Sequence, residues 1–121
     1  MKVDRDLKKR TKSYALSIIG LTKILQNISS NKVIINQLLR SSTSVGANYL
    51  AACYAKSKID FLNKIKIVEE EIVESRYWLE LLHETNDNIS DKINYQIKET
   101  TELISIFAAT IVTIKKSLNN K

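Results

Sequence analysis

The sequence predicts an all-α fold, an antiparallel up-down-up-down four-helix bundle. Three observations support this. Apolar residues recur at steps of three and four in four segments, so each helix would carry an apolar stripe on one face. Short polar breaks separate the segments, and the 121 residues include two glycines and no proline. Short connections make consecutive helices antiparallel neighbours. We therefore expect residues 1–121 to form a single four-helix-bundle domain.

The first segment combines an apolar stripe with a cluster of cations. Its stripe consists of Leu7, Thr11, Tyr14, Ile18, Leu21, Leu25 and Ile28. The cations precede the apolar stretch 14–21, and they are Lys8, Lys9, Arg10 and Lys12. This order resembles a secretory signal, but the stretch is short and continues in helical register past Lys23, which favours a helix. No apolar run approaches the ~20 residues that span a bilayer, so we expect no membrane association.

The second segment contains an unusual run of small residues. Its stripe consists of Ile35, Leu38, Ser42, Val45, Tyr49 and Ala52. Serine, glycine and asparagine are middling to poor helix formers, so a helix that accepts them benefits from close approach to a neighbour. The expected packing residues are Ser41, Ser42, Ser44, Gly46, Ala47 and Asn48. Alternatively, the hydroxyl groups could bind phosphate or another polar ligand.

The three breaks, at 27–31, 55–58 and 85–90, contain residues typical of helix N-caps. The expected caps are Ser29, Ser30 or Asn31 in the first break, Ser57 in the second and Ser90 in the third. Ser57 is followed three residues later by Asp60, a spacing that resembles a capping box. These caps predict where the second, third and fourth helices begin.

The third and fourth segments complete the bundle. The third stripe consists of Phe61, Ile65, Val68, Ile72, Ser75, Leu79 and Leu82. The fourth consists of Ile93, Ile97, Thr100, Ile104, Phe107 or Ala108, and Ile111. Tyr77 and Trp78 flank the third stripe. Large aromatic side chains beside a core often mark a subunit interface, so these two predict an oligomer contact.

The sequence offers little for catalysis or metal binding. Glu80 and His83 have the Glu-x-x-His spacing of di-iron bundles, but those sites need the motif twice, and the chain has one histidine. Cys53 and His83 are the only candidates for a thiol–imidazole pair, and no glycine-rich phosphate loop is present. We expect no enzymatic activity, metal or cofactor. A single cysteine also fits a reducing cytoplasm.

The charge distribution suggests an anionic partner. The net charge is +6, with +10 in residues 1–66 and −4 in residues 67–121. Such asymmetry is typical of nucleic-acid binding or of opposed surfaces that meet in an oligomer. The candidate nucleic-acid-binding residues are Lys8, Lys9, Arg10, Lys12, Arg40, Lys56 and Lys58. Tyr14, Tyr49 and Phe61 occupy stripe positions, so we expect no aromatic platform for bases and only weakly sequence-specific, backbone-directed contacts.

Two stretches carry a family resemblance: residues 38–49, which read LLRSSTSVGANY, and residues 74–79, which read ESRYWL. Together with Asp60-Phe61 they make the chain similar to the four-helix-bundle proteins encoded in intervening sequences of bacterial 23S rRNA genes, also labelled the S23 ribosomal protein family. The resemblance implies ring-shaped homopentamers without enzymatic activity. It also implies nucleic-acid binding, because relatives act as accessory proteins to reverse transcriptases in diversity-generating retroelements. Ala51 replaces a glutamate that the family often has. The alternative is a structural module whose ring docks a partner protein.

Overall fold

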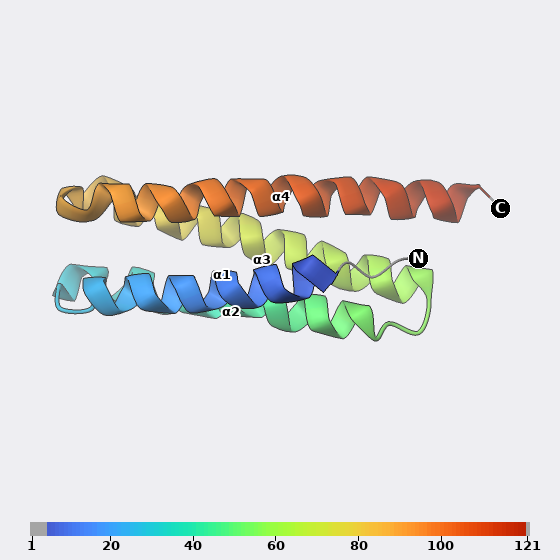
Figure 1. Ribbon diagram of the computed structural model, residues 1–121, viewed down its shortest axis with the longest axis horizontal. Coiled ribbons are helices and arrows are strands. Elements are labelled where there is room, and N and C mark those ends of the chain that lie inside the picture. Colours follow the sequence, from blue (N-terminus) through green and yellow to red (C-terminus); the bar gives the residue numbers. More distant parts are fainter. Residues whose placement is uncertain (1–4, 121) are drawn as a thin grey trace.

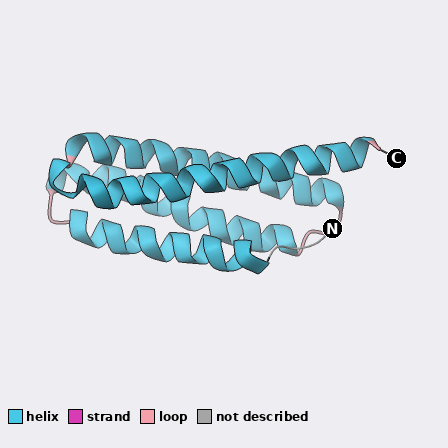
Figure 2. Ribbon diagram, turned by 45° about the horizontal axis from the view of Figure 1, so that its top comes forward, coloured by secondary structure: helices cyan, strands magenta, loops and turns pink. Residues whose placement is uncertain are grey.

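The computed structural model describes residues 5–120, which form four long helices and two single-turn 3₁₀ helices (Figure 1). The long helices are α1 (Arg5–Leu25), α2 (Lys32–Cys53), α3 (Lys58–Thr85) and α4 (Ser90–Asn119). The 3₁₀ helices η1 (Ser29–Asn31) and η2 (Asp87–Ile89) precede α2 and α4. Helices adjacent in sequence pack closely against one another, whereas α1 and α4 make fewer close backbone contacts. The predicted all-α, up-down-up-down bundle is confirmed, and the described residues consist of helix and loop alone (Figure 2).

The core follows the predicted stripes with two corrections. All members of the second and third stripes are buried, and so is the first stripe as far as Leu25. Ile28 is exposed, because α1 has ended and the chain is turning toward η1. In α4 the buried positions are Gln96 and Leu103 rather than Ile97 and Ile104. The sequence of α4 carries two interleaved stripes, and Gln96 turns inward because its side chain hydrogen-bonds to Ser17 Oγ on α1.

The predicted capping of α3 is confirmed, and the other predicted side-chain caps are wrong. Ser57 Oγ accepts a hydrogen bond of 3.0 Å from the backbone N–H of Asp60, whose carboxylate accepts the N–H of Lys56 at 3.2 Å. Ser90 is the first residue of α4, and Ile89 precedes it without a side-chain cap. Asn31 precedes α2, but its side chain is buried and does not cap the helix.

Asn31 instead joins the two connections at one end of the bundle. Its Nδ2 donates to Asn86 Oδ1 at 3.0 Å, and Asn86 Nδ2 donates back to Asn31 Oδ1 at 3.1 Å. The two amides also donate to the carbonyls of Leu25 and Leu82, the last turns of α1 and α3. This buried amide pair therefore satisfies its own polar groups and two helix C-termini at once.

The two buried serines of α2 differ in their hydrogen bonding. Ser41 Oγ lies 2.8 Å from Ser75 Oγ on α3, whereas Ser42 Oγ is fully buried without a hydrogen-bond partner among the described residues. An unsatisfied buried hydroxyl is costly, and alanine is a better helix former. We expect Ser42→Ala to raise the free energy of unfolding by roughly 1 kcal/mol and Ser41→Ala to lower it by a similar amount. Urea denaturation of both variants checks this; a loss of stability in Ser42→Ala would contradict it.

Polar side chains bridge the wider seam between α1 and α4. The hydroxyl of Tyr14 lies 2.7 Å from Thr100 Oγ1, which itself donates to the carbonyl of Gln96 at 2.6 Å. Tyr14 is therefore the donor in the first bond. Burial raises the pKa of Tyr14 from its ordinary value of 10.0 to about 12, so the folded state favours the neutral phenol.

This shift predicts a loss of stability in alkali. Below pH 10 the phenol is neutral in both states and the full stability is present. Between pH 10 and 12 the unfolded chain ionises first, and the free energy of unfolding falls by about 2–3 kcal/mol. Urea denaturation at pH 9 and pH 11.5 measures the loss. Tyr14→Phe is expected to lose less over the same interval, and an equal loss in both proteins would contradict the assignment.

Candidate nucleic-acid interface

Three segments that are distant in the sequence meet at one end of the bundle: the start of α1, the connection between α2 and α3, and the end of α4 (Figure 1). Two contacts tie them together. The ammonium group of Lys8 lies 5.8 Å from the ring centre of Tyr54, and Lys58 Nζ donates to Ser117 Oγ at 2.6 Å. We call the exposed lysines of this end the basic pole, and they are Lys8, Lys9, Lys12, Lys56, Lys58, Lys115 and Lys116.

Five of the seven predicted cations belong to the basic pole, and the two arginines do not. Arg10 donates to both carboxylate oxygens of Glu99, at 2.8 and 2.6 Å, and to Glu102 at 3.0 Å. Arg40 bridges Glu71 at 3.0 Å and Glu74 at 2.5 Å on α3 and lowers the pKa of Glu74. Their charges are compensated within the chain, so the structure places both arginines in ion pairs that join helices.

The lysines at the start of α1 are placed differently. Lys8, Lys9 and Lys12 are exposed, and none of them forms an ion pair with a residue in the described range 5–120. Three uncompensated ammonium groups within five residues of one helix produce a local positive potential. Such a cluster is suited to phosphate groups, which carry the complementary charge.

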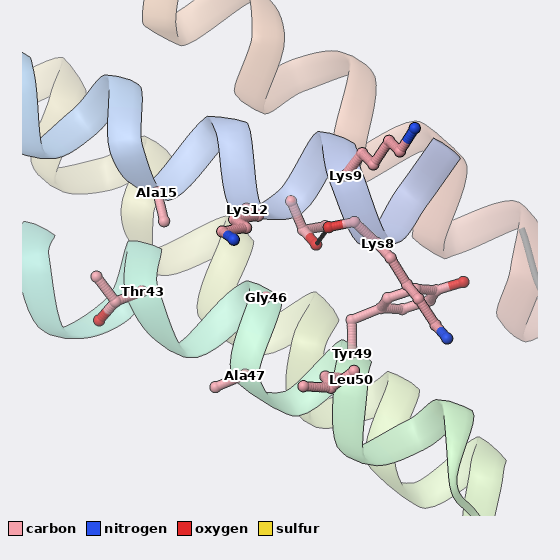
Figure 3. A pocket seen from close by; sticks show the side chains of 10 residues that line it. Lys8, Lys9, Lys12, Ala15, Thr43, Gly46, Ala47, Tyr49 and Leu50 are labelled. Carbon is pink, nitrogen blue, oxygen red and sulfur yellow. Dashed lines mark hydrogen bonds between the residues drawn. The ribbon is translucent and has the colours of Figure 1, made fainter. Parts of the chain in front are cut away.

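A groove of about 420 Å³ lies between α1 and α2, next to these lysines (Figure 3). Small and apolar residues line it, among them Ala15, Gly46, Ala47 and Leu50, and the three lysines border it. At Gly46 the helices approach closely: a Cβ atom there would lie 3.5 Å from the backbone carbonyl of Thr11. Small side chains of both helices therefore line the groove where the helices approach, Ala15 on α1 and Gly46 and Ala47 on α2.

The small residues of α2 thus lie on two faces of the helix. Ser41 and Ser42 are buried in the core, and Gly46 contacts α1. Ser44 and Asn48 hydrogen-bond within α2: Ser44 Oγ donates to the carbonyl of Arg40, and Asn48 Nδ2 donates to that of Ser44. Ala47 is exposed and lines the groove together with residues of α1. The packing role expected of Ala47 therefore stays a prediction.

Sequence reasoning missed three residues of this end. Tyr14, Tyr49 and Phe61 are buried, as their stripe positions predicted, but Tyr54 is 77% exposed and lies beside the lysines. Tyr54 lies outside the stripe positions, so the apolar pattern does not single it out. Lys115 and Lys116 belong to the last turns of α4, which lie beside the α2–α3 connection because Lys58 donates to the neighbouring Ser117. Antiparallel topology alone would have been a sufficient signal for these two lysines.

Comparison with known proteins identifies the family. The model of the family described as 23S rRNA-intervening sequence protein matches residues 4–109. The chain belongs to this family. It is also similar to a crystal structure of a protein of unknown function from the S23 ribosomal protein family of Bacteroides thetaiotaomicron, with 35% identity and a TM-score of 0.80. That match covers 87% of this chain and 97% of the other. The comparison with curated proteins found no match.

The aromatic pair of this intervening-sequence family member lies on the outer face of α3. Tyr77 is 54% exposed, and its ring centre lies 5.0 Å from that of Trp78 in an edge-on arrangement. Trp78 is half-buried against the core, and its Nε1 donates to Glu74 at 3.3 Å. Val73, one turn earlier, is also exposed. These side chains form an exposed apolar patch on α3.

The residues considered for catalysis lie far apart. Cys53 ends α2 near the basic pole, whereas His83 lies 25 residues into α3, about 37 Å along that helix. They cannot form a thiol–imidazole pair within one chain. No group of three or more His, Cys, Asp or Glu side chains in the described part of the chain is arranged to hold a metal ion. None of the described helices has both the length and the apolar character needed to cross a bilayer.

Proposed function

We propose that this 23S rRNA-intervening sequence family member is a non-enzymatic accessory protein that binds RNA or DNA through its basic pole. The observation that carries the proposal is the cluster of exposed lysines that three distant segments contribute to one end of the bundle. Ammonium groups contact phosphate oxygens, which are the same in every sequence. The proposed binding is therefore weakly sequence-specific.

Oligomerisation would strengthen such binding. We propose a homo-oligomer, and the family resemblance suggests a pentamer, with the apolar patch around Tyr77 and Trp78 as a contact surface. A ring repeats the basic pole in every subunit, and weak contacts then add through multivalency. Light scattering at micromolar concentration measures the mass; a monomer would contradict this part of the proposal.

Fluorescence anisotropy with labelled RNA and DNA oligonucleotides at 50 and 200 mM salt tests the function. Each lysine that neutralises a phosphate releases counterions, so five contacts on a single strand predict a loss of affinity of roughly 100-fold between the two salt concentrations. Absence of binding at 50 mM salt, or an affinity that does not change with salt concentration, would contradict the proposal.

A second candidate function is docking of a partner protein. The exposed apolar patch on α3 favours it, since a patch of this kind is typical of a protein contact. A partner held there would bind with little salt dependence, which distinguishes this function from phosphate binding.

A further inference from the structure

Tyr54 has the most exposed large apolar side chain among the described residues. Its backbone is held in place, because its N–H donates to the carbonyl of Ala51 at 3.1 Å and the next N–H, of Ala55, donates to Ala52 at 3.0 Å. The ring thus projects into solvent from an ordered turn at the end of α2. A ring in this position contributes little to the core, and it is attached to backbone that these two hydrogen bonds hold in place.

The surroundings of Tyr54 are cationic and apolar. The Lys8 ammonium lies over the ring, and Lys56 and Lys58 follow two and four residues later. Leu50 lies one helical turn before Tyr54 and lines the groove between α1 and α2. The groove volume of about 420 Å³ falls in the range of sites that hold small organic groups. An apolar surface therefore runs from the groove to the ring, with lysines along it.

This combination matches the chemistry of a single strand. Unpaired bases present flat apolar faces that stack on aromatic rings, while the phosphates beside them bind cations. A duplex keeps its bases stacked on one another, so only its phosphates can contact the same surface of the protein. Tyr54 remains 77% exposed with Lys8 above it, which leaves ring area for a base.

We propose that Tyr54 stacks on a base of a single strand, that the groove between α1 and α2 receives a neighbouring base, and that the basic pole consequently prefers single-stranded RNA or DNA to duplex. This inference rests on the proposed function and names its substrate class. Electrostatics alone predicts the opposite order, because a duplex has the higher charge density and releases more counterions per neutralised phosphate. A preference for single strands therefore reports contacts to bases.

The test compares a labelled 12-nucleotide oligo(dT) with a 12-base-pair DNA duplex, for the wild type and Tyr54→Ala. The wild type is expected to bind the single strand about tenfold more tightly than the duplex. Tyr54→Ala is expected to weaken single-strand binding about tenfold, to leave duplex binding unchanged, and to keep the slope of affinity against salt, because no lysine is removed. Tyr54→Trp is expected to retain the preference.

Tyr95→Ala is the matched control, since Tyr95 is 69% exposed near the other end of the bundle and should affect neither probe. Ala47→Leu tests the groove: Ala47 is exposed, so the larger side chain fills the groove without entering the core. This variant is expected to weaken binding of the single strand but not of the duplex. An unchanged affinity for the single strand would show that the groove does not receive a base.

The outcomes separate this inference from the proposed function. Binding of both probes with no preference, or an equal loss on both in Tyr54→Ala, would overturn the stacking role while phosphate binding stands. Binding of neither probe by the wild type at 50 mM salt would overturn the proposed function itself. Circular dichroism of each variant shows whether a loss of binding reflects a loss of helix.

Discussion

Replacing Lys8, Lys9 and Lys12 together with glutamine is expected to weaken binding to RNA and DNA by roughly 10- to 100-fold at ~100 mM salt. These side chains are exposed and form no ion pair within the described residues, so their charges are available to phosphate. Removing three phosphate contacts should also flatten the logarithmic salt slope by about 2 for a single strand. Fluorescence anisotropy across a salt series measures both quantities.

A control with the same change of charge exists at the other end of the bundle. Lys23, Lys32 and Lys92 are exposed there, near the connections that contain η1 and η2. Replacing these three lysines with glutamine is expected to change the affinity much less. An equal loss in the two triple variants would mean that binding follows net charge rather than the basic pole.

Asn86→Ala is expected to lower the free energy of unfolding by about 2–3 kcal/mol. The substitution leaves Asn31 Oδ1 and one of its N–H groups without partners in a buried site, and the carbonyl of Leu82 loses the shorter of its two side-chain hydrogen bonds. Leaving a buried polar group without a hydrogen-bond partner destabilises the folded state by more than the net stabilisation that the hydrogen bond had provided. Urea denaturation near pH 7 measures the loss.

The double variant Asn31→Ala with Asn86→Ala distinguishes the pair from two independent sites. Once both amides are gone, no side-chain amide is left unpaired, so the double variant should lose less stability than the two single variants added together. Strict additivity, or a change below ~0.5 kcal/mol in Asn86→Ala, would show that the amide pair does not hold the two connections together.

The bundle could be predicted because its apolar periodicity is strong. In α2 and α3 every predicted stripe position is buried, although α3 also exposes apolar side chains outside its stripe, among them Ile67 and Val73. In α4 two registers compete: Ile97 and Ile104 are only half-buried, whereas Gln96 is buried and hydrogen-bonds to Ser17 across the seam. A tertiary hydrogen bond of this kind leaves no trace in the pattern of a single helix.

The candidate site was only partly predictable for a similar reason. The sequence identifies cations, but the acidic partners of Arg10 lie about 90 residues away, and those of Arg40 lie on α3. Conversely, Tyr54 and Leu50 become candidate binding residues only in the folded chain, where Tyr54 is exposed at the end of α2 and Leu50 lines the groove. Compensation of charge and exposure of an aromatic ring depend on which helices become neighbours, and neither can be read from local spacing.

Lysine footprinting locates the nucleic-acid contacts on the bundle directly. The protein is acetylated with and without a saturating single-stranded oligonucleotide, and mass spectrometry compares each lysine. Binding at the basic pole is expected to protect Lys8, Lys9, Lys12, Lys56 and Lys58, while Lys23, Lys32 and Lys92 at the other end react as in the free protein. Protection of that other end, or equal protection along the whole bundle, would contradict binding at the basic pole.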